Sequence, residues 1–173
     1  TARLSFEDVG GNVIRTVTLR RRQSSYTWDL RYPNAAEVTG FHPPVAAGGL
    51  DDTVSGPTVV PGTYTVVLQY GGQSARQTFT VALDPRLQVS ADALQARLQL
   101  GLRLHSALDA LDRTLNRAIA MRKHMSGAAR VRLDGEIAQL VQLDIHSSEG
   151  DLLHESKLRS HLAYIAAEVE LSY

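Results

Sequence analysis

The stretch Gly62–Leu83, GTYTVVLQYGGQSARQTFTVAL, decides the fold of the first half of the chain. Apolar and polar residues alternate on both sides of Gly71-Gly72, and this period of two is typical of half-buried strands. The residues that share a strand face are Tyr64, Val66, Leu68 and Tyr70 before the glycines, and Ala75, Phe79, Val81 and Leu83 after them. Both glycines can adopt a positive φ, so the stretch predicts a β-hairpin with a two-residue turn.

A second hairpin is predicted near the N-terminus, where Gly10-Gly11 separates LSFEDV (residues 4–9) from NVIRTVTLR (residues 12–20). In the second of these segments Val13, Val17 and Leu19 share one face, and Ile14 lies on the other. Short strands joined by hairpin turns, with no helical period, favour an antiparallel β-sandwich over residues 1–84.

The segment SSYTWDLRYP (residues 24–33) contains the only tryptophan of the chain. Its alternation places four large side chains on one face of a predicted strand: Tyr26, Trp28, Leu30 and Tyr32. Strand aromatics are most often structural, so we expect Trp28 in the core; the alternative is an exposed ring that binds a ligand such as a sugar. Asp29 and Arg31 face the other way, where a cross-strand ion pair is expected.

A long loop rich in glycine and proline occupies residues 33–62. Loops of this length are uncommon in compact domains unless they are functional, mobile or contain short strands. We expect short edge strands at AEVTG (residues 36–40) and PTVVP (residues 57–61), with a mobile middle around Gly48-Gly49. Phe41 and His42 are the weak candidates for a ligand-binding platform in this loop.

The second half of the chain changes to a helical period. Ser90 is a predicted N-cap, with Asp92 in the first turn. Three amphipathic helices follow, with these apolar stripes: Leu94, Leu98, Leu104, Leu108, Leu111, Leu115 and Ile119; Val131, Leu133, Ile137, Leu140 and Val141; Leu158, Leu162, Ile165 and Val169. The first is expected to end near Ser126-Gly127. Each helix has one apolar stripe, so the three are predicted to pack as an antiparallel bundle over residues 85–173. The third helix has no stop signal before Tyr173, so the bundle is expected to be truncated there.

The predicted boundary between the two domains is Asp84-Pro85-Arg86. Pro85 fixes its own φ and biases Asp84 toward extended geometry, so the preceding strand must end there. Arg86 is expected to hydrogen-bond Asp84 or nearby carbonyl groups. The fold class is therefore mixed, an all-β part followed by an all-α part.

Composition excludes several classes of function. The 173 residues contain 18 basic and 18 acidic side chains and no cysteine. The zero net charge gives no general attraction to nucleic acid, and the one basic run, Arg20–Arg22, lacks interleaved aromatics. Disulfides, thiolate zinc sites and cysteine nucleophiles are excluded. No apolar run is long enough for membrane insertion, and no signal peptide is visible in the chain.

The sequence predicts no catalytic residue, metal ligand or cofactor. None of the six histidines forms a His-x-x-x-His pair, the helical spacing that favours zinc. Asp51-Asp52 lacks the further carboxylates of a calcium site, and Glu7-Asp8 is interpreted as a pair of turn residues.

Three motifs carry a resemblance to a known family: DVGGNVIRTV (residues 8–17), YTWDLRYP (residues 26–33), and PGTYTVVLQYGG (residues 61–72) closing on ALDPRL (residues 82–87). Together they resemble the Ig-like domain of flagellar hook-capping proteins and of C-terminal modules in secreted bacterial enzymes. With the long helix that follows, they are similar to the C-terminal region of bacterial sortilin-like BNR-repeat β-propeller proteins, often classed as glycosyl hydrolases.

The resemblance implies a propeller upstream, then an Ig-like or fibronectin III-like sandwich, then helices. No Ser-x-Asp-x-Gly-x-Thr-Trp repeat occurs in this chain, so any hydrolase activity would reside in the propeller. The chain itself is then expected to be a non-enzymatic accessory module, periplasmic or secreted, that braces its own propeller or contacts protein partners. The alternatives are a carbohydrate-binding module that uses the loop 33–62 and binds glycans, and a lobe that completes a hydrolase active site. The residues expected to have structural roles are Trp28, Asp29, Arg31, Tyr64, Asp84, Pro85 and Arg86.

Overall fold

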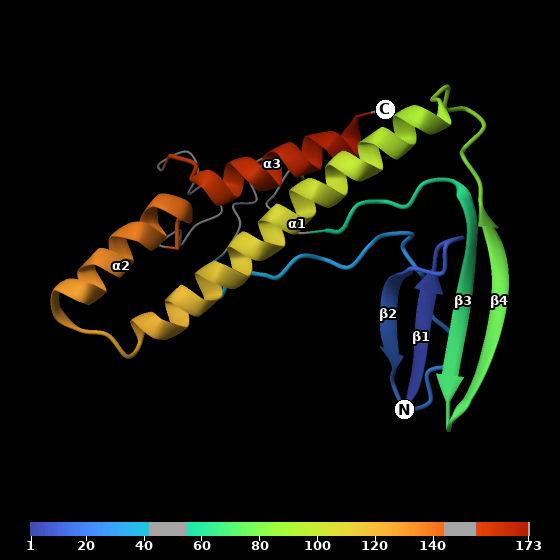
Figure 1. Ribbon diagram of the computed structural model, residues 1–173, viewed down its shortest axis with the longest axis horizontal. Helices are drawn as coiled ribbons and strands as arrows, with labels where there is room; N and C mark the ends of the chain where they lie inside the picture. The colour runs from blue at the N-terminus through green and yellow to red at the C-terminus, as the bar shows by residue number, and fades with distance from the viewer. Residues whose placement is uncertain (42–54, 144–154, 173) are drawn as a thin grey trace. The chain divides into compact units, whose positions relative to one another are not determined.

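A computed structural model describes residues 1–41, 55–143 and 155–172 of the chain (Figure 1). The chain forms two compact units. The first, the sheet unit, comprises Thr1–Pro33 and Gly56–Leu98; the second, the helical unit, comprises Asn34–Ser55 and Gln99–Tyr173. These limits differ from the predicted boundary at Asp84-Pro85, because a segment from the first half of the chain packs with the helices.

The sheet unit contains one four-stranded antiparallel sheet with the order β2-β1-β3-β4 (Figure 1). Its strands are β1 (Ala2–Glu7), β2 (Val13–Leu19), β3 (Gly62–Tyr70) and β4 (Gln73–Val81). Gly71 and Gly72 have φ values of 57° and 80°, which confirms the predicted β3–β4 hairpin. The residues that the structure describes contain no second sheet facing the first, so the predicted sandwich is not confirmed.

A bulge corrects the predicted faces of β2. The pairing register of β1 with β2 shifts between Phe6 and Glu7, so that Phe6 lies opposite Arg15 whereas Glu7 lies opposite Val13. Ile14 is the extra residue, and it is buried while Val13 is exposed. An extra residue in one strand changes the phase of its alternation, so the predicted face of Val13 is wrong.

The Trp28 segment is extended but does not form the predicted strand. Leu30 has a φ of 59°, which interrupts the extended backbone, and only an isolated bridge joins Arg31 to Thr58. The indole of Trp28 stacks on Phe6 with 4.4 Å between ring centroids and packs beside the buried Tyr64. The aromatic rings therefore form much of the core of the sheet unit.

The three predicted helices are present: α1 (Ala91–Arg122), α2 (Gly127–Leu140) and α3 (Leu158–Leu171). The Ser90 hydroxyl accepts a hydrogen bond of 3.1 Å from the amide of Ala93, which confirms the predicted N-cap. Gly127 has a φ of 60°, although it begins α2 and α1 already ends at Arg122.

The predicted apolar stripe of α1 is buried at Leu94, Leu98, Leu108, Leu115 and Ile119, whereas the buried faces of α2 and α3 differ in part from their predicted stripes. In α3, Leu158 and Ile165 are each 48% exposed, whereas Arg159 and Ala163 are buried. In α2, Val131 is exposed and Ile137 is buried. The inward face of α3 therefore includes a charged residue, Arg159.

Candidate functional site

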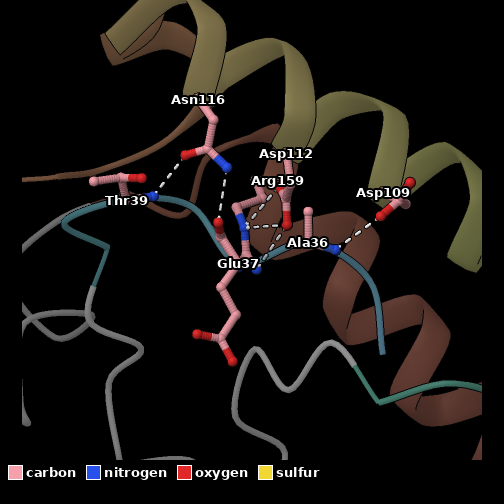
Figure 2. A network of polar contacts seen from close by, with 7 residues as sticks. All are labelled: Ala36, Glu37, Thr39, Asp109, Asp112, Asn116 and Arg159. Atoms are coloured by element: carbon pink, nitrogen blue, oxygen red, sulfur yellow. Dashed lines mark hydrogen bonds and ion pairs between the residues drawn. The ribbon is translucent and has the colours of Figure 1, made fainter. Parts of the chain in front are cut away.

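One face of α1 presents three polar side chains, from Asp109, Asp112 and Asn116 (Figure 2). The spacing of three and then four residues places them in a row along the helix. Asp109 and Asn116 bind the backbone of a segment from the loop after Pro33, and Asp112 binds Arg159 of α3. This row joins the strap, α1 and α3 in one network of polar contacts.

Residues 34–41, here called the strap, run along α1 in the same chain direction. Asp109 accepts a hydrogen bond of 2.8 Å from the amide of Ala36. Asn116 accepts one of 2.7 Å from the amide of Thr39, and its own amide donates to the carbonyl of Glu37 at 2.8 Å. The predicted edge strand at residues 36–40 is therefore wrong, because these backbone groups pair with helix side chains and not with a strand.

The spacing of these contacts explains why the strap follows the helix. Seven residues of an α-helix rise about 10.5 Å, the axial separation of Asp109 and Asn116. Three extended residues, from Ala36 to Thr39, span about 10 Å. The two lengths are commensurate, so an extended segment can satisfy both anchors without strain.

The other side of the strap is apolar. Ala35 is buried with Leu108 of α1 and Ala163 of α3. Val38 is 4% exposed and belongs to the main core cluster of the unit, whose other buried members are Leu115, Ile119, Ile137 and Val141. The strap is therefore part of the core of the helical unit and not a surface loop.

A buried ion pair lies under the strap. The Asp112 side chain is 0% exposed and the Arg159 side chain 2%. The Nε atom of Arg159 lies 3.1 Å and its Nη2 atom 3.1 Å from different carboxylate oxygens, a bidentate arrangement. The guanidinium carbon lies 4.4 Å from the ring centroid of Phe41, which adds a cation–π contact from the end of the strap.

Charge also favours the anchor at Asp109. The Arg113 side chain donates a hydrogen bond of 2.7 Å to Asp109 and is the main cause of the lowered pKa of this carboxyl group. The hydrogen bond from the amide of Ala36 lowers the pKa further, against the opposing effect of partial burial. Asp109 is therefore held as a carboxylate, the form that accepts hydrogen bonds from the strap.

The sequence-predicted ligand platform does not have the expected exposure. Phe41 is half-buried against the core cluster and under Arg159, and His42 lies outside the described residues. Phe41 is half-buried because the end of the strap turns this ring toward the helices. Glycan binding by the loop 33–62 stays a prediction.

The sequence-predicted residues of the sheet unit have packing and polar contacts. Asp29 accepts a hydrogen bond of 2.9 Å from Arg15 of β2, and Arg31 donates one of 3.0 Å to the carbonyl of Gly56. The Tyr64 hydroxyl donates to the carbonyl of Val60 at 2.6 Å, and burial raises the pKa of Tyr64. These contacts hold the extended segments at residues 28–32 and 56–60 on the sheet.

Asp84, Pro85 and Arg86 form a local turn. The amide of Arg86 donates to the carboxylate of Asp84 at 2.9 Å, and its guanidinium binds the same group. The side-chain hydrogen bond from Arg86 lowers the pKa of Asp84. These contacts connect two residues of the turn itself, both of which belong to the sheet unit.

Sequence reasoning missed Asp109, Asp112, Asn116 and Arg159. One signal was present: Asp112 lies four residues after Leu108 and three before Leu115, which is a core position of the helical pattern. A carboxylate at such a position needs a buried cation. The identity of that cation, 47 residues away, is not visible in the sequence.

Among the described residues, no three His, Asp or Glu side chains are grouped so that they could hold a metal ion. Of the described helices, none combines the length and apolar character needed to cross a membrane. No family model, curated protein or solved structure matches the chain.

Proposed function

We propose that this chain is a non-catalytic accessory module of a secreted bacterial β-propeller protein of the glycosyl hydrolase type, in which it braces the propeller or contacts protein partners. The observation that supports this role is the strap. A segment that lies between β2 and β3 in the sequence completes the core of the helical unit and is fastened there by side chains of α1.

The chain passes between its two units three times, after Pro33, before Gly56 and after Leu98. A single linker would let each unit fold and move alone. The first passage leads directly into the strap, whose apolar side chains are buried in the helical core, and this burial supports a structural role for the module. The buried charged groups Asp112 and Arg159 bind each other, which is a structural contact and supports the same role.

The finer part of the proposal is that the sheet belongs to an Ig-like sandwich. The hairpins at Gly10-Gly11 and Gly71-Gly72 and the packed Trp28 support it, together with the resemblance of the motifs around them. Residues upstream of Thr1 provide a direct test. Ser-x-Asp-x-Gly-x-Thr-Trp repeats there would support an upstream propeller, and their absence would contradict the proposed parent protein.

The bracing role can be tested in the full-length protein with and without residues 1–173. We expect deletion to lower the melting temperature of the propeller, with kcat unchanged at temperatures where the propeller remains folded. A loss of kcat in a folded propeller would favour the alternative, a lobe of the active site. An unchanged melting temperature would contradict bracing.

A matched pair of point variants separates bracing from the mere presence of the segment. Asp112→Ala removes the buried carboxylate that pairs with Arg159, whereas Arg113→Ala, one residue away, removes an exposed side chain. If the module braces the propeller, the first variant lowers the melting temperature of the propeller much more than the second, which removes only an exposed pair with Asp109.

A further inference from the structure

The β4 strand forms an open edge of the sheet (Figure 1). It pairs with β3 over nine residues without a register shift, and its residues are exposed from Gln73 to Thr78. Its sequence, QSARQTFTV, contains no proline and no lysine, which commonly block such edges. By contrast the other edge strand, β2, is interrupted by the bulge at Ile14.

The hairpin geometry shows which backbone groups of β4 are available. A two-residue turn with positive φ at both glycines closes on a hydrogen-bonded pair, here Tyr70 and Gln73. Hydrogen-bonded pairs then alternate along the ladder, so the odd-numbered residues of β4 bind β3. The N–H and C=O groups of the even-numbered residues 74–80 point away from the sheet. The side-chain amide of Gln77 donates to the carbonyl of Thr78 at 3.1 Å, as expected for an outward carbonyl without a ladder partner.

We propose that β4 pairs antiparallel with β4 of a second copy of this chain, about a two-fold axis that passes beside Gln77. A two-fold axis normal to the sheet leaves the two faces of the sheet unexchanged. Odd-numbered residues of one β4 strand can therefore lie opposite only odd-numbered residues of the other, and even-numbered residues opposite only even-numbered ones. Full overlap of Gln73–Val81 with itself occurs in one such register, which is centred on Gln77. Two sheets then become one continuous sheet, and no outward group of β4 is left without a partner.

Size and charge are complementary in this register. The small Ala75 lies opposite the large Phe79 of the second copy, and Ser74 lies opposite Thr80. Arg76 lies opposite Thr78, so that like charges do not meet. A register shifted so that the axis passes Arg76 would place two arginines directly opposite each other, which is unfavourable. The strand is therefore self-complementary in the register centred on Gln77.

The absence of cysteine from the chain allows a direct test of the register. In Gln77→Cys the two thiols form a directly opposed, non-hydrogen-bonded pair, with Cα atoms about 4.5 Å apart. This separation is within the range that a disulfide bridges. In the control Ser74→Cys the two thiols are displaced by six residues, about 20 Å.

We expect Gln77→Cys to form a disulfide-linked dimer at least about tenfold faster than Ser74→Cys under mild oxidation. A mixture of Ser74→Cys and Thr80→Cys should form the mixed dimer faster than either variant links to itself. Equal rates for Gln77→Cys and Ser74→Cys would indicate random collision and overturn the proposal. Faster linkage through a cysteine at Leu158 on α3 would overturn it in favour of a helical interface.

A charge pair tests the same edge without oxidation. Thr78→Glu places a carboxylate opposite Arg76 of the second copy, twice by symmetry, and should strengthen dimerisation about fivefold in sedimentation velocity. Thr78→Arg should weaken it by a similar factor. The control Thr18→Arg adds the same charge to an exposed position of β2 and should leave the dissociation constant unchanged. A wild-type chain that stays monomeric at millimolar concentration, or equal effects of Thr18→Arg and Thr78→Arg, would refute the proposal.

Discussion

Removal of the Asp112 carboxylate should be the most damaging single change in the helical unit. In Asp112→Ala the guanidinium of Arg159, 2% exposed, loses the buried carboxylate to which it donates two hydrogen bonds. Breaking a buried pair in this way costs about 3–5 kcal/mol. The cation–π contact between Arg159 and the Phe41 ring remains, and it offsets about 1 kcal/mol of this loss.

Chemical denaturation can measure this effect. Unfolding in urea, followed by circular dichroism at 222 nm, reports the helices. With a slope of about 2 kcal/mol per molar urea, a loss of about 3 kcal/mol lowers the midpoint by about 1.5 M. Arg113→Ala is the matched control, because an exposed pair spaced i,i+4 contributes only about 0.3–0.5 kcal/mol. A midpoint for Asp112→Ala within about 0.3 M of this control would refute the reasoning.

Four further variants test other parts of the structure. Val38→Ala removes two buried methyl groups from the strap and should lower the free energy of unfolding by about 2 kcal/mol, measured by the same urea titration. Asp109 has a lowered pKa in the folded chain because of Arg113, so its contribution to the free energy of unfolding is fully present above the pKa of the unfolded state. This contribution is lost as the pH falls through the pKa of the folded state. In Asp109→Asn the plot of the free energy of unfolding against pH should therefore be shallower in acid. Gly56→Ala would place a Cβ 2.2 Å from a backbone oxygen and should lower the melting temperature, whereas Gly135→Ala, inside α2 with open space around it, should raise stability by about 1 kcal/mol.

Local patterns predicted much of the secondary structure. The hairpin glycines, the Ser90 cap and the three helical periods are local signals, and each element formed where its signal lies. Alternation in SSYTWDLRYP correctly indicated a packed Trp28, although Leu30 adopts a positive φ and breaks the strand. The bulge at Ile14 was also invisible, because it depends on pairing with β1.

The strap could not be predicted, because its contacts are long-range and most involve backbone groups. Ala36 and Thr39 donate through their amides, which every residue other than proline possesses. The sequence of this segment is equally compatible with an edge strand and with an extended segment on a helix, because both have the same backbone geometry. Its true partner was determined by Asp109 and Asn116, more than 70 residues away.

The polar groups of the helical unit have two different roles, and one experiment separates them. Asp112 and Arg159 are needed as a pair, and replacement of both by apolar residues of similar volume, as in Asp112→Leu with Arg159→Met, should restore most of the stability lost in Asp112→Ala. Asp109 and Asn116 bind backbone groups at two points of the strap, and apolar replacements there would leave the amides of Ala36 and Thr39 without partners. Without these anchors the strap is held by the apolar contacts of Ala35, Val38 and Phe41, which are not directional and do not fix its register along α1. We therefore expect the Asp112/Arg159 double variant to keep slow amide hydrogen exchange at residues 36 and 39. The Asp109→Leu, Asn116→Leu double variant should lose it, even if its helices remain intact by circular dichroism. Equal protection in both would show that apolar packing alone sets the register of the strap.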